Sequence, residues 1–369
     1  MKLWKMFGSD LDNFLEEIMA ELVAKGASDL FYRAGGIPRL KIDGNILPVG
    51  DKVLSVEDLV QATEELTNPR QKEIFHKNSD VDFAVYLKEV GHRFRVSIFL
   101  QRNWPSIVIR NVRSEISSFE DLGLPGELLK KLSSETRGMV LLTGSMGSGK
   151  STTIASMIDH INANSRKHIL TVEEPIEFTF KDKQSLINQR ELGLDVTSYG
   201  VALRSFTLQS PDVIFIGNIC DYATVSSALT AAETGVLVLS TLHTINAAQS
   251  VERLINLFPP HQHQEVRNQL AGLLKGVISL RLIPRKDGLG RLPAYEAMLL
   301  TPTISRLIRD DKIWEIPQFI EEGAIFGMQS FTQSLIKLVR EGKITEEAAL
   351  EASDNRDEFS LSLRGIRKT

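Results

Sequence analysis

The chain has 369 residues, enough for about two domains at roughly 150 residues each. Its 42% hydrophobic and 24% charged residues are typical of a globular protein with a buried core, which excludes a disordered chain and a small disulfide-stapled scaffold. The net charge of −4 argues against a general nucleic-acid binder, whose domain would be strongly basic. A single cysteine, Cys220, excludes an intramolecular disulfide and a cysteine-based zinc cluster. No apolar run approaches the ~18 residues of a membrane helix, so the sequence predicts a soluble protein.

The first part of the chain predicts a small α+β domain over residues 1–113. Apolar residues recur at helical spacing over residues 10–25 and again over Val56–Leu66. Short alternating runs between Gly, Pro and Asn turns predict strands at Leu30–Tyr32, Arg39–Ile42, Asp82–Leu87 and Phe94–Phe99. Residues 114–130 are rich in Ser, Gly and Pro, and we interpret them as a linker.

The rest of the chain, residues 131–369, predicts a parallel sheet covered by helices. Helical patterns alternate with strand-like runs at Met139–Thr143, Ile169–Val172, Val213–Gly217 and Val236–Thr241. This alternation is typical of βαβ units. The stretch from Gln264 to Ile283 predicts a long helix that runs into a strand, and the tail from Thr303 to about Ser353 predicts further helices.

The strongest chemical signal is Gly144-Ser-Met-Gly-Ser-Gly-Lys-Ser151, between a predicted strand and a predicted helix. Glycines let backbone N–H groups surround phosphate oxygens, and the helix that follows directs its positive end at the same place. Lys150 can reach the β- and γ-phosphates, and the Ser151 hydroxyl can ligate Mg²⁺. The sequence therefore predicts an ATP and Mg²⁺ site formed by Gly144, Ser145, Met146, Gly147, Ser148, Gly149, Lys150, Ser151 and Thr152.

Further motifs lie on both sides of this loop. They are Gly26-Ala-Ser-Asp-Leu30, Arg93-Phe-Arg-Val96, Ile169-Leu-Thr-Val-Glu-Glu-Pro-Ile-Glu177, Ala231-Ala-Glu-Thr-Gly235 and Thr241-Leu-His-Thr244. With these motifs the chain resembles the secretion and pilus ATPases, and in particular the type IV pilus retraction ATPases of the PilT and PilU family. Gln101-Arg-Asn103 is more similar to the PilU branch. The similarity covers nearly the whole chain except its two ends.

The resemblance implies a fold, an assembly and partners. It implies a PAS-like N-terminal domain joined to a RecA-like ATPase domain, and a homohexamer in which ATP binds where the two domains meet, aided by a neighbouring subunit. The expected location is the cytoplasm, peripheral to the inner membrane through a pilus platform protein, and a paralogous retraction ATPase is a further expected partner. Extension and type II secretion relatives usually carry a four-cysteine zinc insertion, and its absence here favours the retraction branch.

The same resemblance gives roles to the acidic segment after the phosphate helix. Glu177 would orient or deprotonate the attacking water, and Glu173 or Glu174 would help to hold hydrated Mg²⁺. Glu174 stands where the family usually has Asp, a shorter arm with the same charge. A solvated acidic turn is the alternative interpretation of these residues.

Basic residues of both domains also match the family. Arg93, Arg95 and Arg110 match arginines that approach the phosphates of a bound nucleotide. Strand alternation puts Arg93 and Arg95 on one face, which also suits surface ion pairs. His243, at a predicted strand end, would sense the γ-phosphate, and an ordinary capped histidine is the alternative.

Three positions depart from the family pattern. Asn218 stands where the family has a glutamate that binds the Mg²⁺ shell or polarises water, and an amide carries no charge and cannot act as a base at neutral pH. Val236 replaces the first of two paired histidines, so that only His243 remains. Leu208 replaces an arginine expected near the phosphates or at an interface.

Neighbouring side chains do not replace the missing carboxylate. Asp212 lies six residues back along a strand that rises ~3.3 Å per residue, roughly 20 Å away. Asp221 is interpreted as the N-cap of the helix that carries Val225 and Leu229, in preference to a metal ligand. Cys220 is expected to be a small buried residue.

The sequence therefore predicts an ATP-binding, hexameric motor subunit of type IV pilus retraction, with hydrolysis weakened by Asn218, Val236 and Leu208. The alternative is a hydrolysis-poor accessory subunit that works with an active paralogue. The residues leave this choice open, because catalysis through Glu177 can persist without the missing glutamate. A DNA-handling RecA-like motor is the less favoured third alternative, since the chain is acidic and lacks an aromatic-basic segment, and no nucleic-acid partner is expected.

Overall fold

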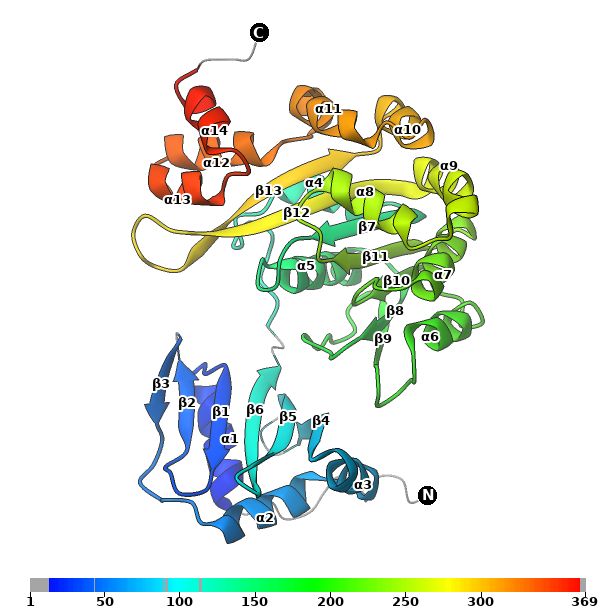
Figure 1. The fold of residues 1–369 in the computed structure, drawn as a ribbon. Helices are drawn as coiled ribbons and strands as arrows, with labels where there is room; N and C mark the ends of the chain where they lie inside the picture. Colours follow the sequence, from blue (N-terminus) through cyan, green and yellow to red (C-terminus); the bar gives the residue numbers. More distant parts are fainter. Residues whose placement is uncertain (1–12, 43, 89, 91, 113–114, 366–369) are drawn as a thin grey trace. The chain divides into compact units, whose positions relative to one another are not determined.

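The computed structural model describes residues 13–365, apart from 43, 89, 91, 113 and 114. The chain forms two compact units, each built on its own sheet (Figure 1). One unit contains the chain up to Glu115 together with Glu177–Thr179, and the other contains Ile116–Ile176 and the chain from Phe180 onwards. The α/β class expected from the sequence is confirmed.

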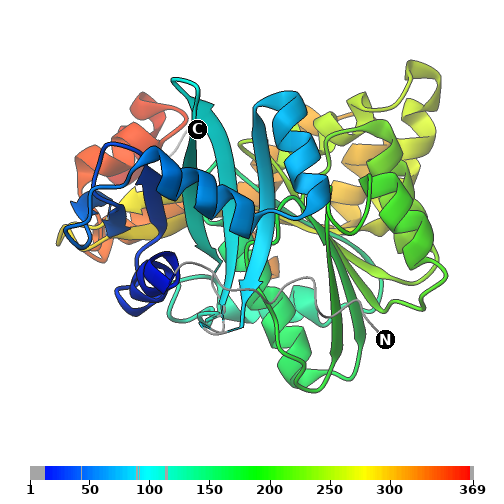
Figure 2. The same ribbon diagram turned by 90° about the horizontal axis from the view of Figure 1, so that it is seen from below.

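The first unit has an antiparallel six-stranded sheet. Its strand order is β3 (Asn45–Pro48), β2 (Arg39–Ile42), β1 (Asp29–Arg33), β6 (Trp104–Val112), β5 (His92–Gln101) and β4 (Asp80–Leu87). Helix α2 (Val56–Leu66) contacts β6, α3 (Pro69–Asn78) contacts β4, and α1 (Asn13–Ala24) contacts β1 (Figure 2). The predicted start of the first helix, residues 10–12, lies outside the described residues.

The sequence analysis found α2 but missed α3, β3 and β6. Both helices begin with a capping box, formed by Ser55 and Asp58 in α2 and by Asn68 and Gln71 in α3. Helix α3 was missed because it buries almost none of its side chains, and every residue of β3 is exposed. Neither element therefore shows the apolar periodicity on which such predictions rest.

The second unit has a seven-stranded, mostly parallel sheet. Its strand order is β13 (Arg291–Leu299), β12 (Leu274–Pro284), β7 (Gly138–Thr143), β11 (Leu237–Leu242), β10 (Val213–Ile216), β8 (His168–Glu173) and β9 (Leu186–Glu191). Only the pairing of β12 with β13 is antiparallel among the described strands of this sheet. All residues of β7, β10 and β11 are buried, as expected for parallel strands covered on both faces.

Helices cover both faces of this sheet (Figure 1). The connection β7–α5–β8 crosses the sheet in one direction and β10–α7–β11 in the other, so right-handed crossovers place α5 and α7 on opposite faces. The helices of this unit are α4 (Gly126–Ser133), α5 (Lys150–Asn164), α6 (Tyr199–Phe206), α7 (Tyr222–Glu233), α8 (Ala247–Asn256), α9 (His263–Leu273), α10 (Pro302–Arg309), α11 (Ile316–Glu322), α12 (Phe331–Arg340), α13 (Glu346–Ala352) and α14 (Arg356–Leu363). The predicted helix-to-strand run is therefore α9 followed by β12, and the helical tail is confirmed.

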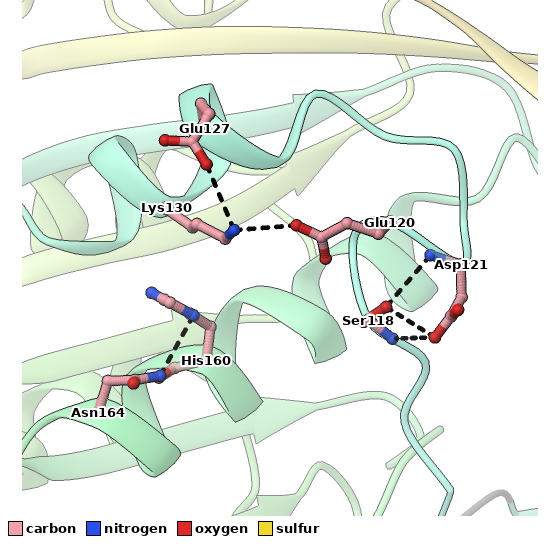
Figure 3. A network of polar contacts seen from close by, with 7 residues as sticks. All are labelled: Ser118, Glu120, Asp121, Glu127, Lys130, His160 and Asn164. Atoms are coloured by element: carbon pink, nitrogen blue, oxygen red, sulfur yellow. Dashed lines mark hydrogen bonds and ion pairs between the residues drawn. The ribbon is translucent and has the colours of Figure 1, made fainter.

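The predicted linker at residues 114–130 is wrong at its C-terminal end, because α4 begins at Gly126. The segment before α4 is also held on the second unit, since Ser156 Oγ of α5 donates to Ser117 O at 2.8 Å and Phe119 is buried in the core. Lys130 of α4 donates to Glu120 at 2.9 Å (Figure 3). Ser118 Oγ accepts from Asp121 N at 3.1 Å and so closes a turn, which composition alone does not distinguish from a flexible link.

No helix in the described part of the chain combines the length and apolar character needed to cross a membrane.

Candidate active site

The phosphate motif forms a tight loop between β7 and α5. Gly144, Gly147 and Gly149 have φ angles of 141°, 75° and 98°, a backbone region that other residues rarely adopt. At Gly144 a Cβ would lie 2.5 Å from both Leu280 O and Ser148 Oγ, so no side chain fits there. Met146 lies at the tip of the loop and is 91% exposed.

Lys150 lies under this loop. It is 7% exposed, and its Nζ donates to Gly144 O at 2.7 Å and to Ser145 O at 2.8 Å. Ser151 and Thr152 follow in the first turn of α5, whose first N–H groups have no partner within the helix. Ser148 Oγ is buried and has no hydrogen-bond partner among the described atoms. An orphaned hydroxyl, a buried ammonium and a helix N-terminus at one loop fit a phosphate group, and the Ser151 hydroxyl is a suitable Mg²⁺ ligand.

The acidic residues divide between the two units. Glu173 ends β8, is 6% exposed, and accepts hydrogen bonds from Thr171 Oγ1 at 2.7 Å and Gln189 Nε2 at 3.2 Å. Glu174 follows it and is exposed. Glu177 belongs to the first unit, so the fold of the second unit alone does not bring it to the phosphate loop. Its predicted role depends on how the two units come together.

Asn218 leaves the sheet at the same edge as Glu174. Ile216, the last residue of β10, pairs with Val172, so the residues two positions further along each strand emerge together. Asn218 is half-buried. Between them lies Gly217, where a Cβ would be 3.2 Å from Glu173 Cα and 3.4 Å from Tyr199 Oη. Asn218, which replaces the family's glutamate, therefore lies among the residues predicted to hold Mg²⁺.

Tyr199 is a neighbour of these carboxylates that the sequence analysis missed. Burial raises the pKa of Tyr199, and the negative charge of Glu174 acts in the same direction. The phenol is therefore neutral at neutral pH. No local signal marks it, because Tyr199 is the first residue of α6 and reaches the site only through tertiary packing.

His243 lies at the same edge as the phosphate loop. It follows β11, whose last residue Leu242 pairs with Thr143, the residue before Gly144. Burial and the positive charge of Lys150 lower the pKa of His243 below its usual value. A neutral imidazole next to the phosphate lysine is compatible with the predicted contact to the γ-phosphate.

The other two departures lie at the opposite edge of the sheet. Val236 precedes β11, and its carbonyl accepts from the N–H of Gly138, the first residue of β7. Leu208 is 88% exposed and follows α6, next to Gln209, whose carbonyl contacts His168 at the start of β8. Because the strands are parallel, this amino edge lies roughly 20 Å from the phosphate loop of the same chain. Val236 and Leu208 therefore lie away from the phosphate loop of their own chain, so the prediction that they weaken hydrolysis stays a prediction and requires a phosphate site across a subunit interface.

The interpretation of Asp221 is confirmed, and that of Cys220 is wrong. The Asp221 side chain accepts from Thr224 N at 2.8 Å and caps α7. Asp212 accepts from His168 N at 2.8 Å, at the amino edge. Cys220 is exposed, because the chain turns outwards between β10 and α7.

The three arginines lie on one face of the six-stranded sheet. Arg95 pairs with Arg110 across β5 and β6, and Arg93 is two residues from Arg95. Arg95 forms an ion pair with Asp82 at 3.6 Å, and Arg110 forms one with Asp29 at 2.8 Å. Surface ion pairs, the alternative interpretation, are therefore present. Directly opposed arginines repel each other, and the ion pairs to Asp82 and Asp29 offset this repulsion.

The class of protein follows from the loop that opens α5. A glycine-rich turn after a buried parallel strand, with a buried lysine at the helix start, defines a P-loop nucleotide-binding protein. The model of the Type II/IV secretion system protein family matches residues 8–291, and the chain belongs to this family.

Its relatives include pilus ATPases. The type IV pilus ATPase PilU of Pseudomonas aeruginosa is 39% identical over 95% of this chain and 91% of its own length. The type IV pilus retraction ATPase PilT of the same organism is 39% identical over 94% of this chain and 99% of its own length. The crystal structure of the pilus retraction motor PilT with bound ADP matches with a TM-score of 0.86 at 40% identity, covering 93% of this chain and 97% of that chain. The resemblance inferred from the motifs is confirmed.

Proposed function

We propose that this chain is an ATP-driven motor subunit of type IV pilus retraction, as in twitching motility. The observation that carries the proposal is the phosphate loop with its buried lysine, in a chain 40% identical to the pilus retraction motor PilT over 93% of its length. One relative in Neisseria gonorrhoeae, named a twitching motility protein, is 41% identical over 88% of this chain.

The proposed mechanism assigns a task to each group of residues. Lys150 and the first N–H groups of α5 bind the phosphates, and Ser151 with Glu173 or Glu174 would hold hydrated Mg²⁺. Mg²⁺ would neutralise charge on the β- and γ-phosphates. Glu177 orients or deprotonates the attacking water, His243 contacts the γ-phosphate, and Arg93, Arg95 and Arg110 stabilise phosphate charge when the two units and a neighbouring subunit meet.

A second candidate function is favoured by Asn218. A hydrolysis-poor subunit that works with an active paralogue would bind ATP normally and turn it over slowly, because an amide stands among the Mg²⁺-binding residues. Steady-state ATP turnover of the purified chain, alone and mixed with an intact paralogue, distinguishes the two. A robust rate of the chain alone supports the motor. Little turnover by the chain alone, with turnover of the mixture above that of the paralogue alone, supports the accessory subunit. No ATP binding at all would contradict both.

The proposed assembly is a homohexamer. The arginines and the phosphate loop belong to different units, so a ring in which they act across an interface would complete the site. The proposed location is the cytoplasmic face of the inner membrane, through a pilus platform protein. Light scattering at micromolar concentration tests the ring, and only monomer, with and without an ATP analogue, would contradict it.

A further inference from the structure

A buried carboxylate that the proposed mechanism does not use lies close to the phosphate loop. Glu296 of β13 is 8% exposed. Its Oε1 accepts from the N–H of Ala247, the first residue of α8, at 2.8 Å, and Ser279 also hydrogen-bonds the carboxylate. Burial raises the pKa of Glu296, with Asp354 acting in the same direction and Arg281 against it. A buried carboxylate is costly unless its oxygens are hydrogen-bonded, so this group needs both contacts.

Strand register connects Glu296 with the phosphate loop. Thr143 of β7 pairs with Ser279 of β12, and Ser279 pairs with Glu296 of β13, so the three side chains lie on one face of the sheet. Thr143 Oγ1 donates to Ser279 Oγ at 2.9 Å, and both residues are fully buried. Thr143 directly precedes Gly144. A buried chain of hydrogen bonds therefore runs from the base of the phosphate loop to the first turn of α8.

Helix α8 follows directly on the segment that carries His243. Four residues, His243 to Asn246, separate β11 from Ala247. Asn246 and Thr244 make local contacts: Asn246 caps α8 by accepting from Gln249 N at 2.9 Å, and Thr244 Oγ1 lies 2.7 Å from Ser250 Oγ. The contact from Glu296 is different, because it comes from a strand on the other side of β7. A negative charge at a helix N-terminus is also favoured by the helix dipole.

We propose that Glu296 is a positioning residue for ATP hydrolysis. It holds the first turn of α8 against Ser279 and Thr143, the residues that lead to the phosphate loop, and so keeps His243 beside Lys150. The inference rests on the proposed ATPase function. It requires no contact between Glu296 and the nucleotide, so its effect is on the rate of the chemical step and not on ATP binding.

The experiment compares Glu296→Ala with Glu296→Gln in the full chain. Glutamine keeps an acceptor for Ala247 N–H and offers an amide donor to Ser279. Alanine leaves the Ala247 N–H buried and unpaired, and it leaves Ser279 with the hydrogen bond from Thr143 alone. The control is Thr345→Ala, which removes the N-cap of α13 and lowers stability near the far end of the β12–β13 hairpin, where Lys286 N–H donates to Lys343 O. Amide hydrogen exchange of residues 243–251, kcat, KM and nucleotide affinity are measured for each variant.

We expect Glu296→Ala to speed exchange over residues 243–251 by about tenfold or more, the effect of losing one buried hydrogen bond. We expect its kcat to fall by about tenfold, with nucleotide affinity within about threefold of the parent. Glu296→Gln should restore most of both, and Thr345→Ala should change neither.

Several results would overturn the inference. The first is unchanged exchange in Glu296→Ala, and the second is faster exchange with a parental kcat. The others are a Glu296→Gln variant as impaired as the alanine variant, and a Thr345→Ala variant with the same loss of kcat. A parent that neither binds nor hydrolyses ATP would instead overturn the proposed function and the catalytic half of this inference with it. Hydrogen exchange needs no nucleotide, so the two failures are distinguishable.

Discussion

The carboxyl and amino edges of the seven-stranded sheet differ in whether a residue that departs from the family pattern lies close to the phosphate loop. The carboxyl edge carries the phosphate loop, Glu173, Asn218 and His243, whereas the amino edge carries Val236 and the chain near Leu208. Both edges contain positions where this chain lacks the expected polar residue. Because a parallel sheet gathers chemistry at its carboxyl edge, only the change at Asn218 lies in this chain's own phosphate site.

The largest expected effect is at Lys150. Lys150→Ala removes a buried charge that would pair with the phosphates, and we expect ATP affinity to fall by about 10²–10³-fold, or roughly 3–4 kcal/mol. Calorimetry with ATP measures this loss. Lys183→Ala is the control, because Lys183 is a half-exposed lysine of the same unit paired with Asp159 at 2.7 Å. Equal affinities of the parent and Lys150→Ala would contradict a phosphate site at this edge.

The second effect concerns hydrolysis at the same edge. Asn218→Glu should raise ATP turnover at saturating Mg²⁺, by up to about 10²–10³-fold, the size expected for one well-placed group, which corresponds to about 2.7–4 kcal/mol. Binding should change little, because Lys150 and the loop amides dominate it. Asn218→Gln tests whether charge and not length is responsible. No gain in the glutamate variant would show that Asn218 does not limit turnover.

A smaller effect is expected at Asp221, which lies after β10 but caps a helix. Asp221→Ala should lower the free energy of unfolding by about 1 kcal/mol, and Asp221→Asn should restore most of it, since asparagine is an equally good N-cap. Burial acts to raise the pKa of Asp221, but the hydrogen bonds from Thr224 lower it overall. Denaturant titration measures the change. A loss of Mg²⁺-dependent turnover at unchanged stability would instead make Asp221 a metal ligand.

The smallest effect is expected at the amino edge. Val236→His introduces the family's residue at a buried position beside Gly138, and turnover should stay within about twofold of the parent. Added to Asn218→Glu, it should give no further gain. A clear increase in turnover from Val236→His would mean that this edge approaches a phosphate site across a subunit interface.

The contiguous sequence Gly144–Ser151 was sufficient to predict the phosphate site. Gly144–Ser151 sits between a strand and a helix that are neighbours in the chain, and its glycines are required by local backbone angles. The capping box of α2 and the parallel strand runs are local signals of the same kind. Local composition failed at residues 114–130, because serine, glycine and proline mark a capped turn and a flexible link alike.

Only the tertiary structure decided which edge each motif residue occupies and which distant groups meet. Val236 directly follows the motif Ala231–Gly235 and His243 belongs to the next motif, yet the length of β11 places the two residues at opposite edges. Thr143 and Ser279 are 136 positions apart and meet through strand register, which leads on to Glu296. Register follows from packing of the whole sheet, and a run of residues along the chain carries no record of the strand that will pair with it.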